Sequence, residues 1–390
     1  MTKRLLGFAA GTVLVAGISA GLWWRIPARH PGTAKSGLDF PSKPELSAGQ
    51  NRPGVVVPSP ATAGAPAVAA DNLLQRVAVD LLGGTPSRNR SALAGVHAQL
   101  AGLPRPAAAQ QLLAFLQSGT DAGTGLPFAV GRGGQLSAAP TLRVAALDWL
   151  GEFDPAAAAE AARQILANSN SADEWAVALR NYYRQNQPAD TYFVAQVEAA
   201  FSRADWLRNP SAGFAESLDF PVAIGGSEGF GILQGLLQKS PAMRWATLAA
   251  MDAWVIGGRA TAIPLLAGTT TTAAALDAGS QAALLSRADI RDDDQRAAIE
   301  SYLSTSSVPD TAKAEFLRQF PNQNMMVASH LVTTSRPMTL QDSARLDLAA
   351  LQWVDDLMQK GTHPELSQAL AASHDRLTGF VASAKRGGQL

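Results

Sequence analysis

The sequence predicts an all-α protein, an α-solenoid of stacked antiparallel helix pairs that follows an N-terminal transmembrane helix and a disordered linker. Two observations predict the helical part. Ala and Leu are frequent while aromatic residues make up 6% of the chain, a composition that favours helix over sheet. Apolar residues recur at helical spacing from about residue 71 to the C-terminus, and short turns that contain Gly or Pro separate the periodic stretches.

The N-terminal helix is predicted from an uncharged run at residues 5–24, which follows a short basic segment at residues 1–4. This length spans a hydrocarbon core of roughly 30 Å, and Trp23-Trp24 suits the membrane interface. A cleaved signal peptide with small residues at Ser19-Ala20-Gly21 is the alternative. Lys3 and Arg4 favour an N-terminus on the inner side of the cell (inner) membrane, with the bulk of the chain on the extracytoplasmic, periplasmic side.

The rest of the chain falls into three parts. Residues 25–70 are rich in Pro, Ala and Gly without a sustained apolar period, which predicts a disordered tether. Residues 71–381 are the predicted α-helical repeat domain, and residues 382–390 a flexible tail. The helices expected in this domain span, in order, residues 72–82, 92–103, 107–116, 142–153, 155–168, 175–183, 192–206, 232–237, 241–257, 260–266, 280–287, 292–303, 312–320, 340–358 and 365–380. Residues 119–139 and 208–229 are expected to be irregular.

The helix pair at residues 140–168 is the clearest of these. The apolar face of its first helix recurs at i, i+4, i+7, i+8 and i+11 through Leu142, Ala146, Trp149, Leu150 and Phe153. Asp154 can then cap a second helix, and Pro155 occupies a position where a missing N–H costs nothing. Two short helices joined by so tight a turn cannot bury both apolar faces alone, so similar pairs are expected on either side.

This pair resembles a HEAT-type helical repeat. The repeat pattern of Arg, small apolar residues, Leu-Gly and Asp-Pro is matched by Arg143, Ala146, Leu150-Gly151 and Asp154-Pro155. The resemblance implies an α-solenoid and a tendency to bind proteins, and it implies no catalytic residues. The expected binding surface is the inner face of the solenoid.

Charge and residue types exclude several functions. Lys plus Arg and Asp plus Glu both number 32, so no overall field attracts nucleic acid. The chain has no cysteine, which excludes thiolate metal sites, thiol nucleophiles and disulfides. The histidines are isolated, and Asp292-Asp293-Asp294 lacks the pattern of a calcium loop and is better placed to start a helix. We therefore expect no catalytic, cofactor-binding or metal-binding residues, no cofactor, and no enzyme.

One literal catalytic motif remains, the Gly-x-Ser-x-Gly at residues 225–229. A nucleophile elbow needs a tight strand-to-helix turn, so a serine hydrolase that uses Ser227 is one alternative function. Pro221 interrupts the only candidate strand before it, and no alternating βαβ pattern surrounds it. The competing structural interpretation is that Ser227 caps the next helix.

These features together predict a membrane-tethered helical-repeat scaffold or adaptor that contacts the lipid bilayer through Leu5–Trp24 and binds another protein, but no nucleic acid, on the extracytoplasmic side. A membrane-anchored steric chaperone or foldase for a secreted enzyme is the main alternative. The layout of anchor, Pro/Ala-rich segment and helical body is similar in outline to that of lipase foldases. The chain lacks the Arg-x-x-Phe-Asp-Tyr signature of that family.

Overall fold

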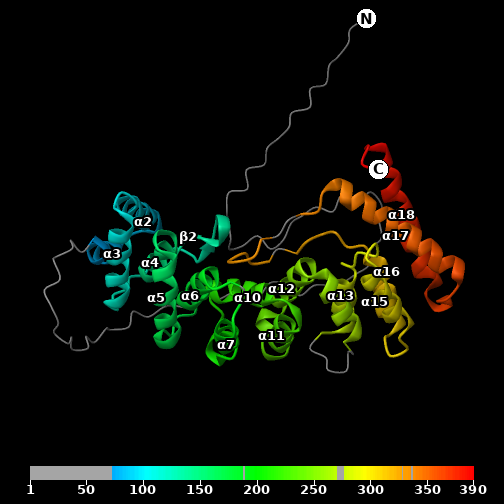
Figure 1. Ribbon diagram of the computed structural model, residues 1–390, viewed down its shortest axis with the longest axis horizontal. Helices are drawn as coiled ribbons and strands as arrows, with labels where there is room; N and C mark the ends of the chain where they lie inside the picture. Colours follow the sequence, from blue (N-terminus) through cyan, green and yellow to red (C-terminus); the bar gives the residue numbers. More distant parts are fainter. Residues whose placement is uncertain (1–72, 188, 270–275, 327, 335–336) are drawn as a thin grey trace, which may run out of the picture. The chain divides into compact units, whose positions relative to one another are not determined.

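The computed structural model describes residues 73–187, 189–269, 276–326, 328–334 and 337–390. The chain divides into two units, Met1–Asp71 and Asn72–Leu390, and all described residues belong to the second. Helices make up nearly all of its regular structure, which confirms the predicted all-α class (Figure 1). Within the described ranges, none of the helices combines the length and hydrophobicity needed to cross a bilayer. The predicted anchor at residues 5–24 and tether at residues 25–70 lie outside these ranges.

The helices follow one another along the second unit, and their connections are short except between α3 and α4 and between α16 and α17. Those of its first part are α1 (Leu73–Leu81), α2 (Pro86–Ala101), α3 (Arg105–Gln117), α4 (Leu142–Phe153), α5 (Pro155–Asn168), α6 (Ala172–Gln185), α7 (Thr191–Ala200), α8 (Ala204–Arg208), α9 (Ala212–Glu216) and α10 (Asp219–Ile224). Those of its second part are α11 (Gly226–Lys239), α12 (Arg244–Gly257), α13 (Arg259–Gly268), α14 (Ala278–Leu285), α15 (Asp293–Ser304), α16 (Asp310–Gln319), α17 (Leu340–Lys360) and α18 (Ser367–Arg386). Strands β1 (Ala129–Val130) and β2 (Leu136–Ala138) form one antiparallel hairpin between α3 and α4.

Local sequence signals explain many of the helix starts. In many helices the side-chain oxygen of the N-cap residue accepts a hydrogen bond from the backbone N–H three residues later. The N-cap residues that do so are Thr85, Thr141, Asp154, Ser171, Asp190, Ser211, Asp277, Asp292 and Thr339. The predicted cap at Asp154 is confirmed, with 3.0 Å between its Oδ1 and the nitrogen of Ala157. Asp292 also caps α15 as the sequence predicts, so the three consecutive acids there complement a helix N-terminus.

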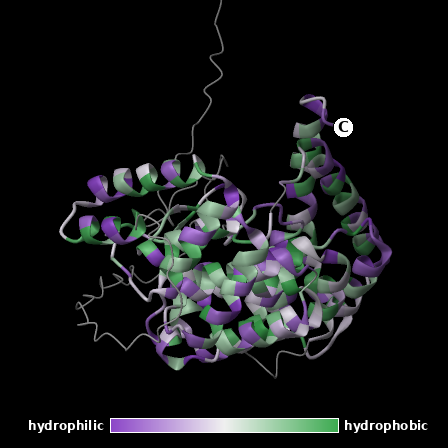
Figure 2. Cartoon of the chain, turned by 60° about the vertical axis from the view of Figure 1, so that its left-hand side comes forward, coloured by the Kyte–Doolittle hydropathy of each residue, from purple (hydrophilic) through white to green (hydrophobic). Residues whose placement is uncertain are grey.

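Packing is dominated by neighbours in the chain. Helix α4 packs on α3, α5 and α6, then α11 on α10 and α12, and α18 on α16 and α17. Hydrophobic and hydrophilic residues alternate along the helices in Figure 2, as expected where each helix buries one face. The predicted apolar faces of α12 and α17 are buried, including Trp254 and Trp353. The aromatic rings predicted for the core of α6, Trp175 and Tyr182, are buried as well.

Several predicted boundaries were wrong. Helix α2 begins at Pro86 rather than residue 92, because Thr85 caps it there and proline is accommodated in a first turn. The expected helix at residues 192–206 is divided into α7 and α8 by residues 201–203. The C-terminal helix continues to Arg386, five residues beyond the predicted end of the domain at residue 381, and it buries Val381 and Ala384.

The larger correction concerns residues 208–229, which form α9, α10 and the start of α11 instead of an irregular stretch. Pro221 suggested a break, yet it occupies the third position of α10. The first N–H groups of a helix have no intrahelical acceptor, so proline loses nothing at that position. Residues 119–139, expected to be a loop, contain the short β1–β2 hairpin.

Candidate functional site

The connection between α16 and α17 crosses helices that precede it by many residues. In Figure 1 this stretch leaves the end of α16, runs along the earlier helices toward β2 and returns to α17. We call residues 321–326 and 328–334 the crossing segment. Its main hydrogen-bond partners come from α6, α10, α12 and the end of α14, and they join residues 35 to 147 positions apart. We call the four side chains that hold it, Arg184, Asp219, Asp252 and Arg287, the crossed face.

Asp252 and Arg287 form a buried ion pair in the crossed face. Arg287 Nε and Nη2 donate to Asp252 Oδ1 and Oδ2 over 2.6 and 3.0 Å, and both side chains are 3% exposed. Both side chains also form hydrogen bonds with the crossing segment. Asp252 Oδ2 accepts the Met326 N–H at 3.0 Å, and Arg287 Nη1 donates to the Asn322 carbonyl at 2.9 Å. The buried pair thus binds one N–H and one C=O of the crossing segment through charge-assisted hydrogen bonds.

Asp219, the first residue of α10, holds the far end of the crossing segment. Its Oδ2 accepts two successive backbone N–H groups, those of Val332 at 2.6 Å and Thr333 at 2.8 Å, and Oδ1 accepts the Thr333 hydroxyl. Asp219 is 1% exposed, and burial raises the pKa of its carboxyl although these three donors act in the opposite direction. One carboxylate therefore binds two adjacent amides and a hydroxyl.

Arg184, near the end of α6, joins the crossing segment to the β1–β2 hairpin. Its Nη2 donates to the carbonyl of Leu331 at 3.2 Å and also to the carbonyl of Gly133. Burial, reinforced by the nearby charge of Arg180, lowers the pKa of the Arg184 guanidinium to about 10. Both acceptors are carbonyl oxygens, so this cation binds main chain.

The hairpin itself is held by a second pair of the same kind. Arg180 donates to a carboxylate oxygen of Asp148 and, over 2.8 Å, to the Gly134 carbonyl. Both carboxylate oxygens of Asp148 lie 3.2 Å from the Leu136 nitrogen. Arg180 is fully buried, and desolvation raises the pKa of Asp148 despite the guanidinium beside it. Both buried Asp–Arg pairs thus bind one N–H and one C=O of a non-helical segment.

The crossing segment is also fixed where it leaves α16. Gln323 Nε2 donates to Asp347 Oδ1 on α17 over 2.8 Å, and Arg376 on α18 donates to the carbonyls of Leu317 and Phe320. Burial raises the pKa of Asp347 to about 6, with Arg376 and Gln323 acting against that shift. Charged side chains from the middle of the described unit and from its last two helices, α17 and α18, therefore contact this one connection.

The chemistry of the crossed face is recognition of polypeptide main chain. Its four side chains bind carbonyls of residues 322 and 331 and N–H groups of residues 326, 332 and 333. By contrast, most side chains of the crossing segment are at least partly exposed, Met326 by 39%, whereas Leu331 is fully buried. The described residues hold no group of three His, Cys, Asp or Glu that could bind a metal ion. The arrangement of these side chains supports the binding of main chain.

Ser227 lies elsewhere, in the first turn of α11. Gly225 is the N-cap of this helix, no side chain caps it, and the prediction that Ser227 does so is wrong. Gly225 and Gly226 have φ of 72° and 50°, which lets the chain turn from α10 directly into α11. Since a helix rather than a strand precedes it, the motif lacks the strand-to-helix turn of a nucleophile elbow.

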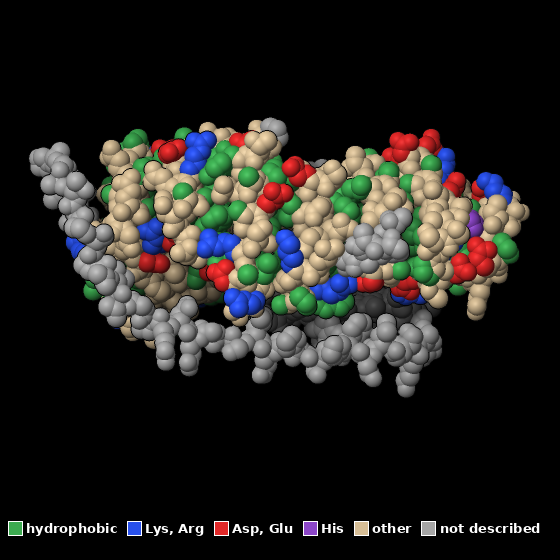
Figure 3. Space-filling view, turned by 90° about the horizontal axis from the view of Figure 1, so that it is seen from below, with side chains coloured by type: hydrophobic (Ala, Val, Ile, Leu, Met, Phe, Trp, Pro, Cys, Tyr) green, Lys and Arg blue, Asp and Glu red, His purple; other side chains and the backbone are tan. Residues whose placement is uncertain are grey.

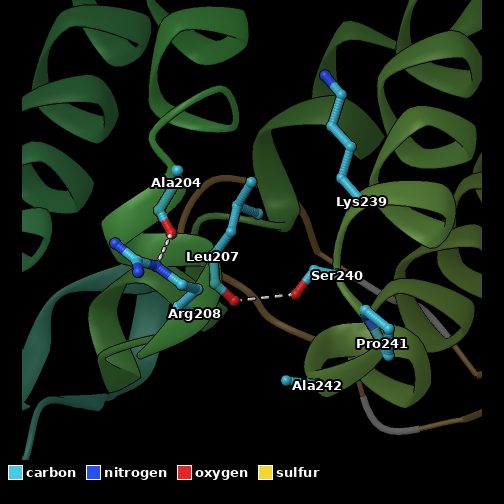
Figure 4. Close-up of a pocket in the computed structure, with 7 residues that line it drawn as sticks. All are labelled: Ala204, Leu207, Arg208, Lys239, Ser240, Pro241 and Ala242. Atoms are coloured by element: carbon cyan, nitrogen blue, oxygen red, sulfur yellow. Dashed lines mark hydrogen bonds between the residues drawn. The ribbon is translucent and has the colours of Figure 1, made fainter.

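A second candidate site is a shallow pocket of about 270 Å³ between α8 and residues 239–242, which run from the end of α11 into the turn before α12. In Figure 4, Arg208 folds back on its own helix, where its Nε donates to the Ala204 carbonyl, and the Lys239 side chain points away from it. Ser240 is bound to the Leu207 carbonyl at 3.1 Å. The two cations therefore do not converge on a common ligand position. The face seen in Figure 3 carries acidic and basic side chains interspersed.

Sequence reasoning selected none of the charged residues of the crossed face. A signal was present for three of the buried charges, because each directly follows an apolar residue on a buried helix face: Asp148 after Leu147, Arg180 after Leu179 and, in the crossed face, Asp252 after Met251. Charges are rarely fully buried unless they are paired, so such positions mark buried polar partners. No family model, curated protein or solved structure matches the chain.

Proposed function

We propose that this protein is a membrane-tethered helical-repeat scaffold or adaptor that binds another protein on the extracytoplasmic side. The observation that supports the proposal most is the crossed face, where Asp219, Asp252 and Arg287 bind the main chain of a non-helical segment. Every protein carries these main-chain groups. A surface that satisfies them is suited to an extended stretch of a partner.

The proposed architecture is an α-solenoid of stacked antiparallel helix pairs, with α4 and α5 as a HEAT-like unit. Two findings support it. The tight turn at Asp154-Pro155 joins α4 to α5, and helices pack mainly on neighbours in the chain. A solenoid presents a long continuous surface built from successive repeats, which suits a partner that binds along many helices.

The proposed location follows from residues 1–70. The uncharged residues 5–24 are long enough to span a bilayer, and residues 25–70 have the composition of a flexible tether. A tether of this length reaches on the order of 4 nm, using roughly 5–6 Å × √n. The folded unit could then meet a partner at some distance from the membrane.

The test is a quantitative crosslinking pull-down of the full-length chain from membranes. We expect one partner to be recovered in a reproducible molar ratio. Asp219→Asn should reduce that recovery, whereas Asp293→Asn should not, because the Asp293 side chain is 85% exposed at the start of α15 and belongs to another surface. Recovery of no partner from correctly inserted, folded protein would contradict the proposal.

A further inference from the structure

We propose that the crossing segment is an internal ligand on the crossed face, and that an extended segment of the partner protein displaces it and makes the same main-chain contacts. This inference rests on the proposed function and names the chemistry of the partner. The occupant is thus a non-helical polypeptide segment, and the chain's own residues 321–326 and 328–334 show what fits.

The first argument is the kind of group that is recognised. Asp252 accepts an N–H, Arg287 and Arg184 donate to carbonyls, and Asp219 accepts two N–H groups. None of these contacts depends on the identity of the side chain at the bound residue. A second segment that follows the same path would make the same hydrogen bonds to these charged side chains, so exchange leaves none of them unpaired.

The second argument is the limited burial of the crossing segment. Of its described residues, Leu331 and Pro321 have buried side chains, and the others are partly or largely exposed. The apolar area lost when the segment leaves the face is therefore mainly that of Pro321 and of Leu331, which belongs to the hydrophobic core. Release also costs the hydrogen bonds, which a partner's main chain replaces.

The contacts also describe the partner's sequence. The residue that takes the place of Thr333 should carry a hydroxyl, because Asp219 binds the Thr333 hydroxyl as well as its N–H. An apolar residue should stand two positions earlier, where Leu331 is fully buried. Proline is excluded at the positions of residues 326, 332 and 333, because each of these donates its N–H.

Covalent attachment gives the internal segment an advantage. A tethered ligand has an effective concentration of about millimolar, so a free peptide must compete with it. Weakening the internal segment should therefore make the crossed face available to the same sequence added in trans. Thr333→Pro is the suitable change, since it removes both the N–H and the hydroxyl that Asp219 accepts and alters no residue of a helix.

The experiment measures binding of a fluorescent synthetic peptide, with the sequence of residues 320–334, to the full-length chain in detergent by fluorescence anisotropy. The Thr333→Pro protein should bind this peptide at least tenfold more tightly than the unaltered protein or the Thr333→Ser control. The same peptide carrying Thr333→Pro should bind none of them. Failure of the unaltered peptide to bind a Thr333→Pro protein of native helicity would overturn the inference.

A second measurement covers the case in which the Thr333→Pro protein is misfolded. Hydrogen exchange of residues 326–333 is followed in the unaltered full-length chain while an isotope-labelled peptide of residues 320–334 is added at several millimolar. Displacement predicts exchange at least tenfold faster in these residues, and unchanged exchange at saturation would overturn the inference. An empty pull-down contradicts the proposed function, whereas a recovered partner that leaves this exchange unchanged contradicts only the internal-ligand inference.

Discussion

Asp252 and Arg287 form a two-hydrogen-bond ion pair, and each of them also binds the main chain of the crossing segment. The residues stand 35 positions apart, and both are almost fully buried. Water is thus excluded from a charged group that fixes a non-helical segment to α12 and to the end of α14. The crossed face is therefore a structural element of the fold, and in the proposed function it is also the surface that binds a partner.

Asp252→Ala should destabilise the protein strongly. The change leaves the Arg287 guanidinium buried without its counter-charge, which typically costs about 3–5 kcal/mol. The measurement is urea unfolding followed by circular dichroism. The exposed Asp293→Asn is the matched control and should cost below about 1 kcal/mol. Equal losses of unfolding free energy in the two variants would contradict this prediction.

The double change Asp252→Leu with Arg287→Met should separate stability from recognition. Replacing a buried ion pair by apolar residues of similar size is often neutral or stabilising, so the free energy of unfolding should return to within about 1–2 kcal/mol of the original. The Met326 N–H and the Asn322 carbonyl nevertheless lose their partners. Hydrogen exchange of the Met326 amide should therefore be faster in the stable double variant than in the unaltered chain. Equal protection of this amide in the two proteins would contradict the proposed role of the pair in holding the crossing segment.

Asp219→Asn should loosen the crossing segment locally. An Asn side chain keeps one acceptor oxygen but loses the charge that binds two amides and a hydroxyl, a loss of about 1–3 kcal/mol. Amide exchange at Val332 and Thr333 should accelerate by about tenfold or more, at 1.4 kcal/mol per tenfold. Amides of α4 and α17 serve as internal controls and should not change. A uniform acceleration over the whole chain would instead indicate global destabilisation.

The pH dependence of stability should carry a contribution from Asp347. Its pKa is about 6 in the folded protein, whereas an Asp in the unfolded chain titrates near 4. The folded state therefore binds the proton more tightly, and this group makes the protein more stable as the pH falls from about 7 to 5. Asp347→Asn should remove that rise from unfolding curves measured at successive pH values. Parallel pH profiles of the two proteins would contradict the shift.

Two substitutions compare a predicted cap with a disproved one. Asp154→Ala should cost about 1 kcal/mol, because Asp154 accepts the Ala157 N–H at the start of α5. Ser227→Ala should stay within about 0.5 kcal/mol, because no side chain caps α11. The measurement is thermal unfolding of both variants and of the original chain, from which the change in unfolding free energy is obtained. A larger loss at Ser227 would mean that this serine has a role outside helix capping.

Helical periodicity was sufficient for most of the fold. The apolar face of α4, the turn at Asp154-Pro155 and the buried face of α17 all follow from spacing and local caps, which are properties of neighbouring residues. The prediction failed at residues 208–229, where Pro221 and several glycines indicated a loop. Proline in a first turn is compatible with helix, and this depends on where the helix begins.

The candidate site was less accessible from the sequence. Its contacts join Arg184 to Leu331 and Asp219 to Thr333 across more than 100 residues, and periodicity carries no information on such pairings. The crossing segment itself has no regular period, so it resembles an ordinary connection. The buried charges were the usable signal, since Asp148, Arg180 and Asp252 each interrupt an apolar helix face.

Photo-crosslinking from Glu216 tests the central claim most directly. Glu216 on α9 directly follows Ala215, whose carbonyl accepts a hydrogen bond from the Ser329 hydroxyl of the crossing segment, and the exposed Val79 on α1 is the comparison position. A photoreactive residue at 216 should crosslink to the crossing segment in the purified full-length chain and to a partner protein in membranes, while the same residue at 79 should give neither product. Partner crosslinks that arise from position 79 alone, with position 216 still joined to its own chain in membranes, would contradict the account.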